Sequence, residues 1–311
     1  MGKSLALRAE ENALHLPYMK ALFLYSDATG QGKMLAHVGD VISRLRKTFS
    51  QLEAVQTHSQ DELIARAKGA CGGKVDALIV AGGDGTFHHV VNALMDEEKT
   101  PILGYINAGT ICDIGKNFGI QGSYENALDI IERGYTTYFD VGKINDQYFT
   151  YVSAVGAYSD IAYIAPRDRK KRLGAVAYYT IAVGESLKPT KVIADIEADG
   201  KQYHIKTPFI LLLNGSHVGG FHVNQRLASI SDGKMELYLT KPGFFNGLIH
   251  YLFFKMRTLK ISASHFKIHT NIDMPWCLDG EEGPKGDVEI SVISKKLMIY
   301  AKPPKRFFHH G

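Results

Sequence analysis

The sequence of 311 residues has little cysteine and no long apolar run, and each absence excludes a class of protein. The three cysteines, Cys71, Cys112 and Cys277, are widely spaced and form no CxxC pair. They therefore indicate a reducing compartment and argue against a structural zinc site. No apolar run approaches the ~18 residues that a membrane-spanning helix needs, and the mixed, charged first residues show no signal-peptide pattern. We expect a cytoplasmic protein without a transmembrane segment.

Two common nucleotide-binding motifs are also missing. The P-loop pattern GxxxxGK[ST] does not occur, because Gly32-Lys33 lacks both the first glycine and the following hydroxyl. No GxGxxG follows the first expected strand, at 21–25, which excludes a dinucleotide-dependent dehydrogenase. The net charge of +4 is too small to indicate nucleic acid as a partner, and it suits contact with an anionic membrane surface.

The most informative feature that is present is the turn Gly82-Gly83-Asp84-Gly85-Thr86. It follows an apolar run at 76–80, typical of a buried parallel strand, and precedes a segment, 87–94, with apolar residues at helical spacing. The glycines let the backbone approach a ligand, and the free N–H groups of a helix start suit a phosphate. Asp84 would repel an anion alone, so a magnesium–nucleotide explains both features. A plain glycine-rich turn is the alternative.

Strand and helix patterns alternate through the first half of the chain. Strands are expected at 21–25, near 55, at 76–80 and at 102–106, with helices at 41–52, 61–70 and 87–94. This alternation predicts a parallel sheet with helices on both faces, whose ligand lies beyond the carboxyl ends of the strands. The turns at those ends converge there; they lie at 26–33, 57, 82–86 and 108–110. We expect a nucleotide-binding α/β domain over 19–138, rejoined by residues 302–311.

The second half reads mostly as strands separated by glycine turns. Strands are expected at 150–155, 192–198, 204–213, 234–240, 266–270, 288–291 and 297–301. Two helical interruptions are expected at 171–187 and 244–256. The pattern predicts an antiparallel sandwich or barrel-like domain over 139–301. Residues 1–18 show no clear pattern and are expected to be an extension outside the fold.

Taken together, short motifs along residues 19–303 resemble the bacterial diacylglycerol kinase-like lipid kinases, relatives of sphingosine kinases and more remotely of NAD kinases. Each motif is short, but their order and spacing are jointly specific. They are 82–86, Gly109-Thr110 with Asp113, Asn214-Gly215 with Gly219-Gly220, Asp232-Gly233, and Leu278-Asp279-Gly280-Glu281. The resemblance implies an α/β N-terminal domain of the NAD-kinase and diacylglycerol-kinase type, followed by a mostly β C-terminal sandwich.

Three positions depart from the family pattern. The first phosphate turn, Ser26-Asp27-Ala28-Thr29-Gly30, keeps only the hydroxyl and the last glycine of the family's Asn-Pro-x-Ser-Gly. His88-His89 stands where the family often has Asn-Glu, and Cys112 replaces the Asn that usually precedes Asp113. These changes leave the backbone N–H groups of the glycine turn available for phosphate and affect the contacts to adenine and ribose.

The resemblance implies a site for ATP and a catalytic magnesium ion in the α/β domain. Backbone N–H groups of the glycine turn would hold the phosphates, and Asp84 would hold magnesium directly or through water, because hard oxygen ligands suit that ion. The implied nucleotide-binding residues are Ser26, Thr29, Gly30, Thr57, Gly82, Gly83, Asp84, Gly85, Thr86 and Thr110. For each threonine, a turn or helix-capping role is the alternative.

The resemblance also implies that Asp279 and Glu281 hold the proton acceptor that an alcohol substrate needs. Either Asp279 takes the proton while Glu281 orients it, or the roles are reversed. The alternative is a surface Asp-Gly turn, a common use of that dipeptide. Since Asp84, Asp279 and Glu281 would share one ATP, a metal is needed to offset their repulsion.

Two further features resemble or suggest metal sites. The loop 229–234 resembles the family's structural magnesium loop, in which Asp232 gives a carboxylate and Ser229 and Lys234 mostly give backbone carbonyls; a hairpin turn is the alternative. His88 and His89 are adjacent on a helix and therefore point about 100° apart, so they cannot chelate one ion together. We interpret them as a helix face beside the phosphate turn.

These features predict an ATP- and magnesium-dependent lipid kinase that phosphorylates the primary hydroxyl of a diacylglycerol-like lipid to give phosphatidic acid. It would work at the membrane surface as a peripheral protein, and a free sheet edge would allow a homodimer. An aromatic stripe at 244–253 and a basic tail at 302–308 are candidates for membrane contact; core packing is the alternative for the stripe. The functional alternatives are another acceptor (a sphingoid base, phosphatidylglycerol or NAD) and a nucleotide-sensing module without turnover, against which the retained Asp279 and Glu281 argue.

Overall fold

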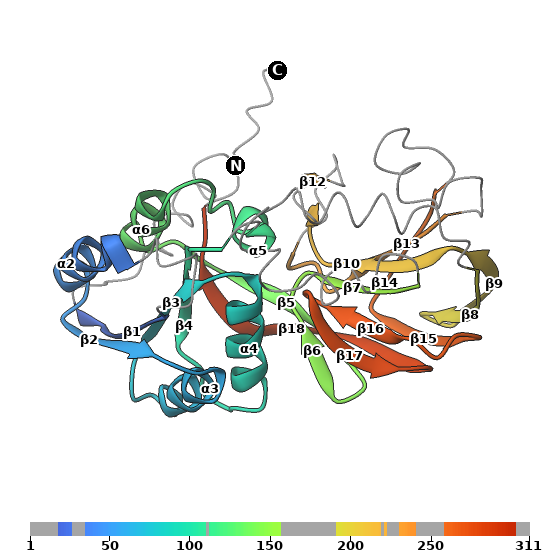
Figure 1. Cartoon of the computed structure of the whole chain (residues 1–311), viewed down its shortest axis with the longest axis horizontal. Coiled ribbons are helices and arrows are strands. Elements are labelled where there is room, and N and C mark those ends of the chain that lie inside the picture. The colour runs from blue at the N-terminus through green and yellow to red at the C-terminus, as the bar shows by residue number, and fades with distance from the viewer. Residues whose placement is uncertain are drawn as a thin grey trace, which may run out of the picture.

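The computed structural model describes residues 18–26, 35–109, 112–156, 191–218, 221–222, 230–240 and 258–302. Several predictions concern residues outside these ranges: the extension before residue 18, the helices at 171–187 and 244–256, and the tail after residue 302. Figure 1 shows the α/β half, with the N-terminal strands, beside a half built from strands.

The first half is a parallel sheet with helices on both of its faces. Its strands pair in the order β2-β1-β3-β4, all parallel. Helices α2 and α6 lie on one face, and α3 and α4 on the other (Figure 1). The elements are β1 Lys20–Ser26, η3 Leu35–His37, α2 Val38–Thr48, β2 Gln51–Thr57, α3 Gln60–Gly69, β3 Ala77–Gly82, α4 Asp84–Met95, β4 Ile102–Asn107, α5 Asp113–Asn117 and α6 Tyr124–Glu132. All six residues of β3 are buried, because helices cover both of its faces.

The second half is built from strands wherever the structure describes it. They are β5 Thr136–Ile144, β6 Gln147–Phe149, β7 Val152–Gly156, β8 Val192–Ala198, β9 Lys201–Thr207, β10 Phe209–Leu213, β11 His217–Val218, β12 Phe221–His222, β13 Met235–Thr240, β14 Thr258–Ala263, β15 His265–Thr270, β16 Pro275–Leu278, β17 Glu281–Lys285 and β18 Val288–Tyr300. The predicted fold class, an α/β part followed by a mostly β part, is confirmed.

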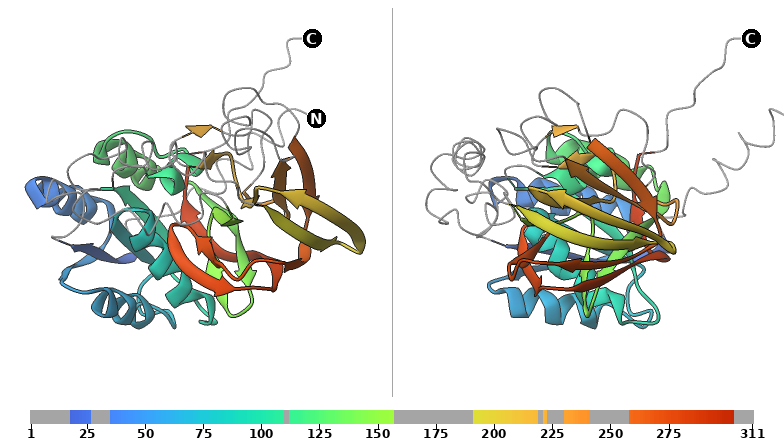
Figure 2. Two further views of the ribbon diagram at one scale, coloured as in Figure 1. Left: turned by 45° about the vertical axis from the view of Figure 1, so that its right-hand side comes forward. Right: turned by 90° about the vertical axis from the view of Figure 1, so that its right-hand side faces the viewer.

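Two large sheets organise these strands, apart from β11 and β12, which among the described strands pair only with each other. The larger continues the parallel sheet in the order β2-β1-β3-β4-β18-β15-β8-β9, with β5 on β18 and β6 on β5. The smaller is antiparallel, in the order β14-β13-β10-β7-β16-β17. In the views of Figure 2 the strands of the second half form two layers. A buried apolar cluster that includes Trp276, Phe266 and Leu212 lies between them, so this half is a sandwich.

Strand β18 joins the two halves. It pairs antiparallel with β15 and β5, and its end is parallel to β4, where Ile299 lies beside Leu103. Two separate strands were expected here, at 288–291 and 297–301; the structure has one strand with an irregularity between Ile293 and Leu297. The expected domain boundary after residue 138 falls within β5, and the domain limits stay a prediction.

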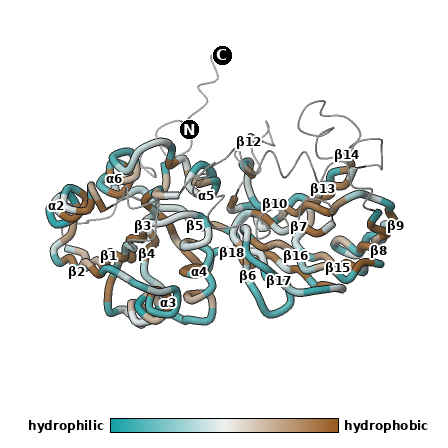
Figure 3. Tube along the Cα trace, in the orientation of Figure 1, coloured by the Kyte–Doolittle hydropathy of each residue, from teal (hydrophilic) through white to brown (hydrophobic). Residues whose placement is uncertain are grey.

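The expected strand at 204–213 is divided between the two sheets. It breaks at Pro208, which has no N–H for a sheet ladder, so β9 ends in the large sheet and β10 begins in the small one. Hydrophobic residues concentrate along the central strands of both halves and hydrophilic residues along the outer turns (Figure 3). In the described part of the chain, no helix is long and apolar enough to cross a membrane.

Candidate active site

The glycine turn forms the link that its sequence predicted, from strand β3 into helix α4. Gly82 ends β3, Gly83 is the helix N-cap in extended conformation, and Asp84 begins α4. A Cβ on Gly82 would lie 2.5 Å from the Thr86 Cβ, so glycine is needed there for close packing. Among the described residues no side chain caps α4, which leaves the N–H groups of its first turn open to a ligand.

The turn that follows β4 lies directly against this glycine turn. A Cβ on Gly109 would lie 2.8 Å from the Gly83 Cα, and one on Gly83 would lie 3.5 Å from the Gly109 Cα. The convergence of strand-end turns expected from the alternating pattern is therefore present for this pair. Both backbones approach closely because neither residue carries a side chain.

Asp84 connects the glycine turn to helix α5. Its carboxylate accepts hydrogen bonds from the Asp113 N–H at 3.1 Å and the Ile114 N–H at 3.2 Å. Burial, and then the nearby Asp113 carboxylate, raise the pKa of Asp84 to about 7, since both disfavour its charged form. Asp113 is itself fully buried and pairs with Lys116 at 3.0 Å.

Asp279 and Gly280 form the turn of a β-hairpin. Leu278 and Glu281 are partners across β16 and β17, so two residues remain in the loop. Their φ angles are 52° and 98°, and positive values at both positions are what a type I′ hairpin turn requires. The Asp-Gly turn is real, but it is not on the surface, because Asp279 is only 3% exposed.

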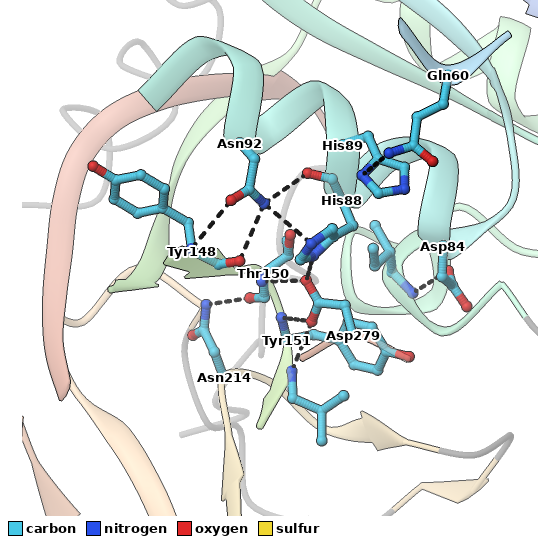
Figure 4. Close-up of polar contacts among 12 residues, drawn as sticks. Gln60, Asp84, His88, His89, Asn92, Tyr148, Thr150, Tyr151, Asn214 and Asp279 are labelled. Carbon is cyan, nitrogen blue, oxygen red and sulfur yellow. Dashed lines mark hydrogen bonds and ion pairs between the residues drawn. The ribbon is translucent and has the colours of Figure 1, made fainter. Parts of the chain in front are cut away.

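Four donors surround the Asp279 carboxylate (Figure 4). Backbone N–H groups donate from Thr150 at 2.6 Å, Tyr151 at 3.0 Å and Val152 at 3.1 Å. The fourth contact is His88 Nδ1, at 3.0 Å. A carboxylate has about four lone-pair positions, so these contacts occupy all of them. Asp279 has no lone pair left for the proton of a substrate.

Glu281 differs from Asp279 in both contacts and exposure. It is partly exposed, and no residue that the structure describes donates a hydrogen bond to its carboxylate. A Cβ on Gly85 would lie 2.8 Å from the Glu281 Oε1, so this carboxylate faces the glycine turn. Beside it, burial and then His88 lower the pKa of His89, and the Glu281 charge acts in the opposite direction.

A second polar cluster, missed in the sequence, lies behind the hairpin around Asp140 of β5. The Asp140 carboxylate accepts from the Gly233 N–H at 2.7 Å, and the Asn214 amide donates to the carbonyls of Asp140 at 2.6 Å and Thr150 at 2.9 Å. Burial raises the pKa of Asp140. An acidic residue within the apolar run at 139–144 was the signal that could have revealed it.

Residues 20–144 match the family model of the diacylglycerol kinase catalytic domain. A diacylglycerol kinase of Bacillus subtilis (strain 168) is 29% identical over 275 residues, which are 85% of this chain and 90% of the relative. One of Staphylococcus aureus (strain bovine RF122 / ET3-1) is 27% identical over 291 residues, 91% of this chain and 92% of the relative. The chain is therefore similar to bacterial diacylglycerol kinases over most of its length. It is thus a phosphotransferase of the kinase type with an alcohol acceptor.

A solved structure confirms the fold of this diacylglycerol kinase-like chain. The crystal structure of a diacylglycerol kinase from Bacillus anthracis str. Sterne superposes with a TM-score of 0.79, covering 92% of this chain and 98% of that one. The two sequences are 22% identical, so the likeness concerns the fold alone. The predicted family, fold class and class of enzyme are all confirmed.

In this diacylglycerol kinase-like fold, the predicted site residues lie in several places. Residues 82–86 and Glu281 meet, whereas Ser26 and Thr57 are partners at the ends of β1 and β2. The Thr57 hydroxyl is buried and donates to the Tyr25 carbonyl at 3.3 Å. Four predicted residues lie outside the described ranges: Thr29, Gly30, Thr110 and Ser229.

The loop expected to hold structural magnesium is a turn in which the Asp232 carboxylate accepts from the Lys234 N–H at 3.1 Å. Within the described residues, no group of three or more His, Cys, Asp or Glu side chains is arranged to hold a metal ion. Its role in metal binding stays a prediction. The sequence analysis did not predict a partner for His88. In the structure its ring contacts the Asp279 carboxylate.

Proposed function

We propose that this chain transfers the γ-phosphoryl group of ATP to the primary hydroxyl of a diacylglycerol-like lipid and so produces phosphatidic acid. The observation that carries the proposal is the approach of the Glu281 carboxylate to Gly85 of the glycine turn. A carboxylate free of hydrogen bonds to the described residues thereby faces the place where phosphates would lie. The relatives named diacylglycerol kinase support the choice of acceptor.

The carboxylates around Asp84 fit a magnesium ion. The pKa of Asp84 is raised to about 7 by burial and by the neighbouring Asp113 and Asp279 carboxylates, so a bound cation would stabilise its charged form. Carboxylate oxygens are the ligands that magnesium prefers, and Asp84 would hold the ion. When bound, magnesium would neutralise charge on the phosphate oxygens during transfer.

The start of α4 suits the phosphates of ATP. The N–H groups of its first turn have no side-chain cap, and the positive end of the helix dipole points at the same place. Close contact between Gly83 and Gly109 joins this cradle to the turn after β4. Both turns would therefore hold one nucleotide between them.

We assign the proton acceptor to Glu281 and a positioning role to Asp279. As the substrate oxygen forms its bond to the γ-phosphorus and the bond to ADP breaks, the hydroxyl proton would pass to Glu281. Asp279 cannot do this in the observed arrangement, because its carboxylate already accepts from three backbone N–H groups and contacts His88. Of the two role assignments left open by the sequence, this is the one that the contacts favour.

The first experiment measures transfer of labelled γ-phosphate from Mg-ATP to diacylglycerol in mixed micelles. Glu281→Gln should lower kcat by about 100- to 10,000-fold, the usual contribution of a general base, while ATP still binds. Glu282→Gln is the matched control, since Glu282 is the adjacent exposed carboxylate of β17 and should leave kcat unchanged.

The outcome of that assay decides between the alternatives. Absence of product from the wild-type chain would overturn diacylglycerol as acceptor, and a panel of sphingoid bases, phosphatidylglycerol and NAD would follow. If none of these acceptors were phosphorylated although the chain bound ATP, a nucleotide-sensing module would be the better proposal. If the Glu281→Gln variant had the same kcat as the wild-type chain, Glu281 would not be the proton acceptor.

We also propose that the chain works as a peripheral protein at the membrane surface, because a diacylglycerol-like acceptor resides there. Co-sedimentation with anionic vesicles, before and after deletion of residues 304–311, tests whether the basic tail contributes. Unchanged binding after the deletion would remove the tail from that role. The homodimer stays a prediction, for which the mass in solution is the measurement.

A further inference from the structure

Helix α4 carries a buried histidine, His88, whose ring lies against the turn of the β16–β17 hairpin. His88 is 7% exposed, and its Nδ1 lies 3.0 Å from Oδ2 of Asp279, 191 residues later in the chain. The other donors to this carboxylate belong to the segment Thr150, Tyr151 and Val152. Among the described residues, His88 is therefore the contact that joins Asp279 to α4.

Asn92, one turn further along α4, lies against the other ring nitrogen of His88. Its amide nitrogen donates to the carbonyls of His88 at 2.9 Å and Tyr148 at 3.1 Å, and its amide oxygen accepts from the Tyr148 N–H at 3.1 Å. These three bonds fix the orientation of the amide, so its nitrogen is what faces His88 Nε2 at 3.3 Å. An amide nitrogen cannot accept a hydrogen bond, so a hydrogen on Nε2 would have no acceptor in Asn92, whereas a hydrogen on Nδ1 has the Asp279 carboxylate as its acceptor. The contacts therefore favour the form of His88 with its hydrogen on Nδ1.

We propose that His88 is a positioning residue for the phosphoryl transfer, through its Nδ1–H bond to Asp279. This inference rests on the proposed function. His88 lies three residues after Gly85 on the same helix, and Glu281 lies two residues after Asp279 in the same hairpin. One hydrogen bond thus ties the helix that begins at the phosphate cradle to the turn that presents the proton acceptor, and it sets how closely Glu281 faces Gly85.

The consequence concerns the rate of transfer rather than the binding of ATP. The cradle consists of backbone groups of the glycine turn, which His88 does not contact in any described hydrogen bond. Loss of the bond to Asp279 would let the hairpin move relative to α4. A displacement of about 1 Å between a catalytic group and its substrate can cost about 100-fold in rate.

Two isosteric substitutions separate the ring nitrogens. The amide nitrogen of asparagine stands at the same number of bonds from the backbone as His Nδ1, and that of glutamine matches Nε2. His88→Asn should keep kcat within about threefold of wild type, whereas His88→Gln and His88→Ala should lower it about 10- to 100-fold at unchanged affinity for Mg-ATP. His204→Gln is the control, an exposed histidine whose Nδ1 pairs with Asp195 at 2.6 Å in the second half.

The measurements are kcat and KM with the acceptor that the wild-type chain uses, ATP affinity by calorimetry, and thermal unfolding of each variant. The proposal is supported if the Asn variant is active and the Gln variant is impaired at equal ATP affinity. It is overturned if the two variants behave alike, or if the loss lies in ATP binding.

A second measurement does not depend on activity. Nitrogen NMR of the histidine rings in the wild-type protein should show His88 protonated at Nδ1 and not at Nε2 at neutral pH. A hydrogen on Nε2 alone would overturn the inference, even if the Gln variant failed to fold. Failure of the proposed function would appear separately, as absence of phosphoryl transfer by the wild-type chain with an intact Nδ1–H signal.

Discussion

The three carboxylates of the candidate site, Asp84, Asp279 and Glu281, share one chemistry in water and have different surroundings here. Asp84 accepts two backbone N–H groups beside another carboxylate, and its pKa is raised to about 7. Asp279 has every lone pair engaged, and Glu281 has no hydrogen bond from the described residues. These differences support the three roles that we propose, which are metal binding for Asp84, positioning for Asp279 and proton acceptance for Glu281.

The raised pKa of Asp84 predicts how the stability of the metal-free chain depends on pH. A carboxyl with a pKa near 7 when folded and about 4 when unfolded binds its proton more tightly in the folded chain. Its contribution to the free energy of unfolding is therefore fully present below about pH 4 and is lost as pH rises through 7. Compared with Asp84→Asn, the wild-type chain should lose melting temperature between pH 5 and 8.

Thermal unfolding of both chains across that range, with and without Mg-ATP, is the measurement. If Asp84 holds magnesium as proposed, the ion binds the ionised carboxylate and should stabilise the wild-type chain more as pH rises and the Asn variant little. Asp146→Asn, at an exposed turn, is a control that should follow the wild type. Parallel curves for wild type and Asp84→Asn would contradict the prediction.

Among the elements, the two glycine turns after β3 and β4 form one surface because neither has a side chain where they touch. Gly83 and Gly109 approach until a Cβ on Gly109 would lie 2.8 Å from backbone. The hairpin β16–β17 completes the site with a turn whose positive φ angles suit Asp-Gly. The close approach of the two glycine turns and the hydrogen bonds of Asp279 are therefore made at turn positions.

Substitution Gly109→Ala should separate the two turns. The new methyl would meet the Gly83 Cα rather than a flexible side chain, so the backbone itself must move. Overpacking of this kind costs about 1–3 kcal/mol, which we expect to appear as a loss of about 10-fold or more in ATP affinity. Titration calorimetry with Mg-ATP measures it.

Gly39→Ala provides the comparison for that experiment. A Cβ on Gly39, in α2, would meet nothing within 4 Å, so this variant should bind ATP as the wild type does. The close approach of the two turns would not matter for binding if both variants kept full affinity.

At the scale of the whole molecule, β18 joins the two halves into one structure. Its first part contributes Val288 and Ile290 to the core of the sandwich. Its last part contributes Leu297, Ile299 and Tyr300 to the core of the α/β half. Unfolding of one half would therefore displace β18 and disturb the core of the other half.

This arrangement predicts that the chain unfolds in one cooperative transition. Calorimetry should show one peak whose calorimetric and van't Hoff enthalpies agree, and probes in the two halves should report the same midpoint. Ile290→Ala, which removes a fully buried side chain, should lower the midpoint of both probes together. Two separate transitions, with only the sandwich affected by the substitution, would contradict it.

Local patterns predicted the α/β half well, because its signals lie within short stretches. The apolar run before Gly82, the glycines and the following helical spacing together form β3, the turn and α4 where they were expected. In the second half the strand at 204–213 was wrong as one element, since Pro208 divides it. The strands β5, β6, β14, β16 and β17 were missed. Short strands with few alternating residues carry little periodicity to detect.

The sequence by itself indicated the resemblance to the diacylglycerol kinases, the class of enzyme and the glycine turn between β3 and α4, because each depends on motifs of neighbouring residues. Only the tertiary structure decided the different surroundings of Asp279 and Glu281, on which their proposed roles rest. Asp279 meets Thr150 across 129 residues and His88 across 191, and no local pattern encodes such contacts. Whether a carboxylate is saturated or free depends on which donors the fold brings to it, and that is settled only when distant segments pack together.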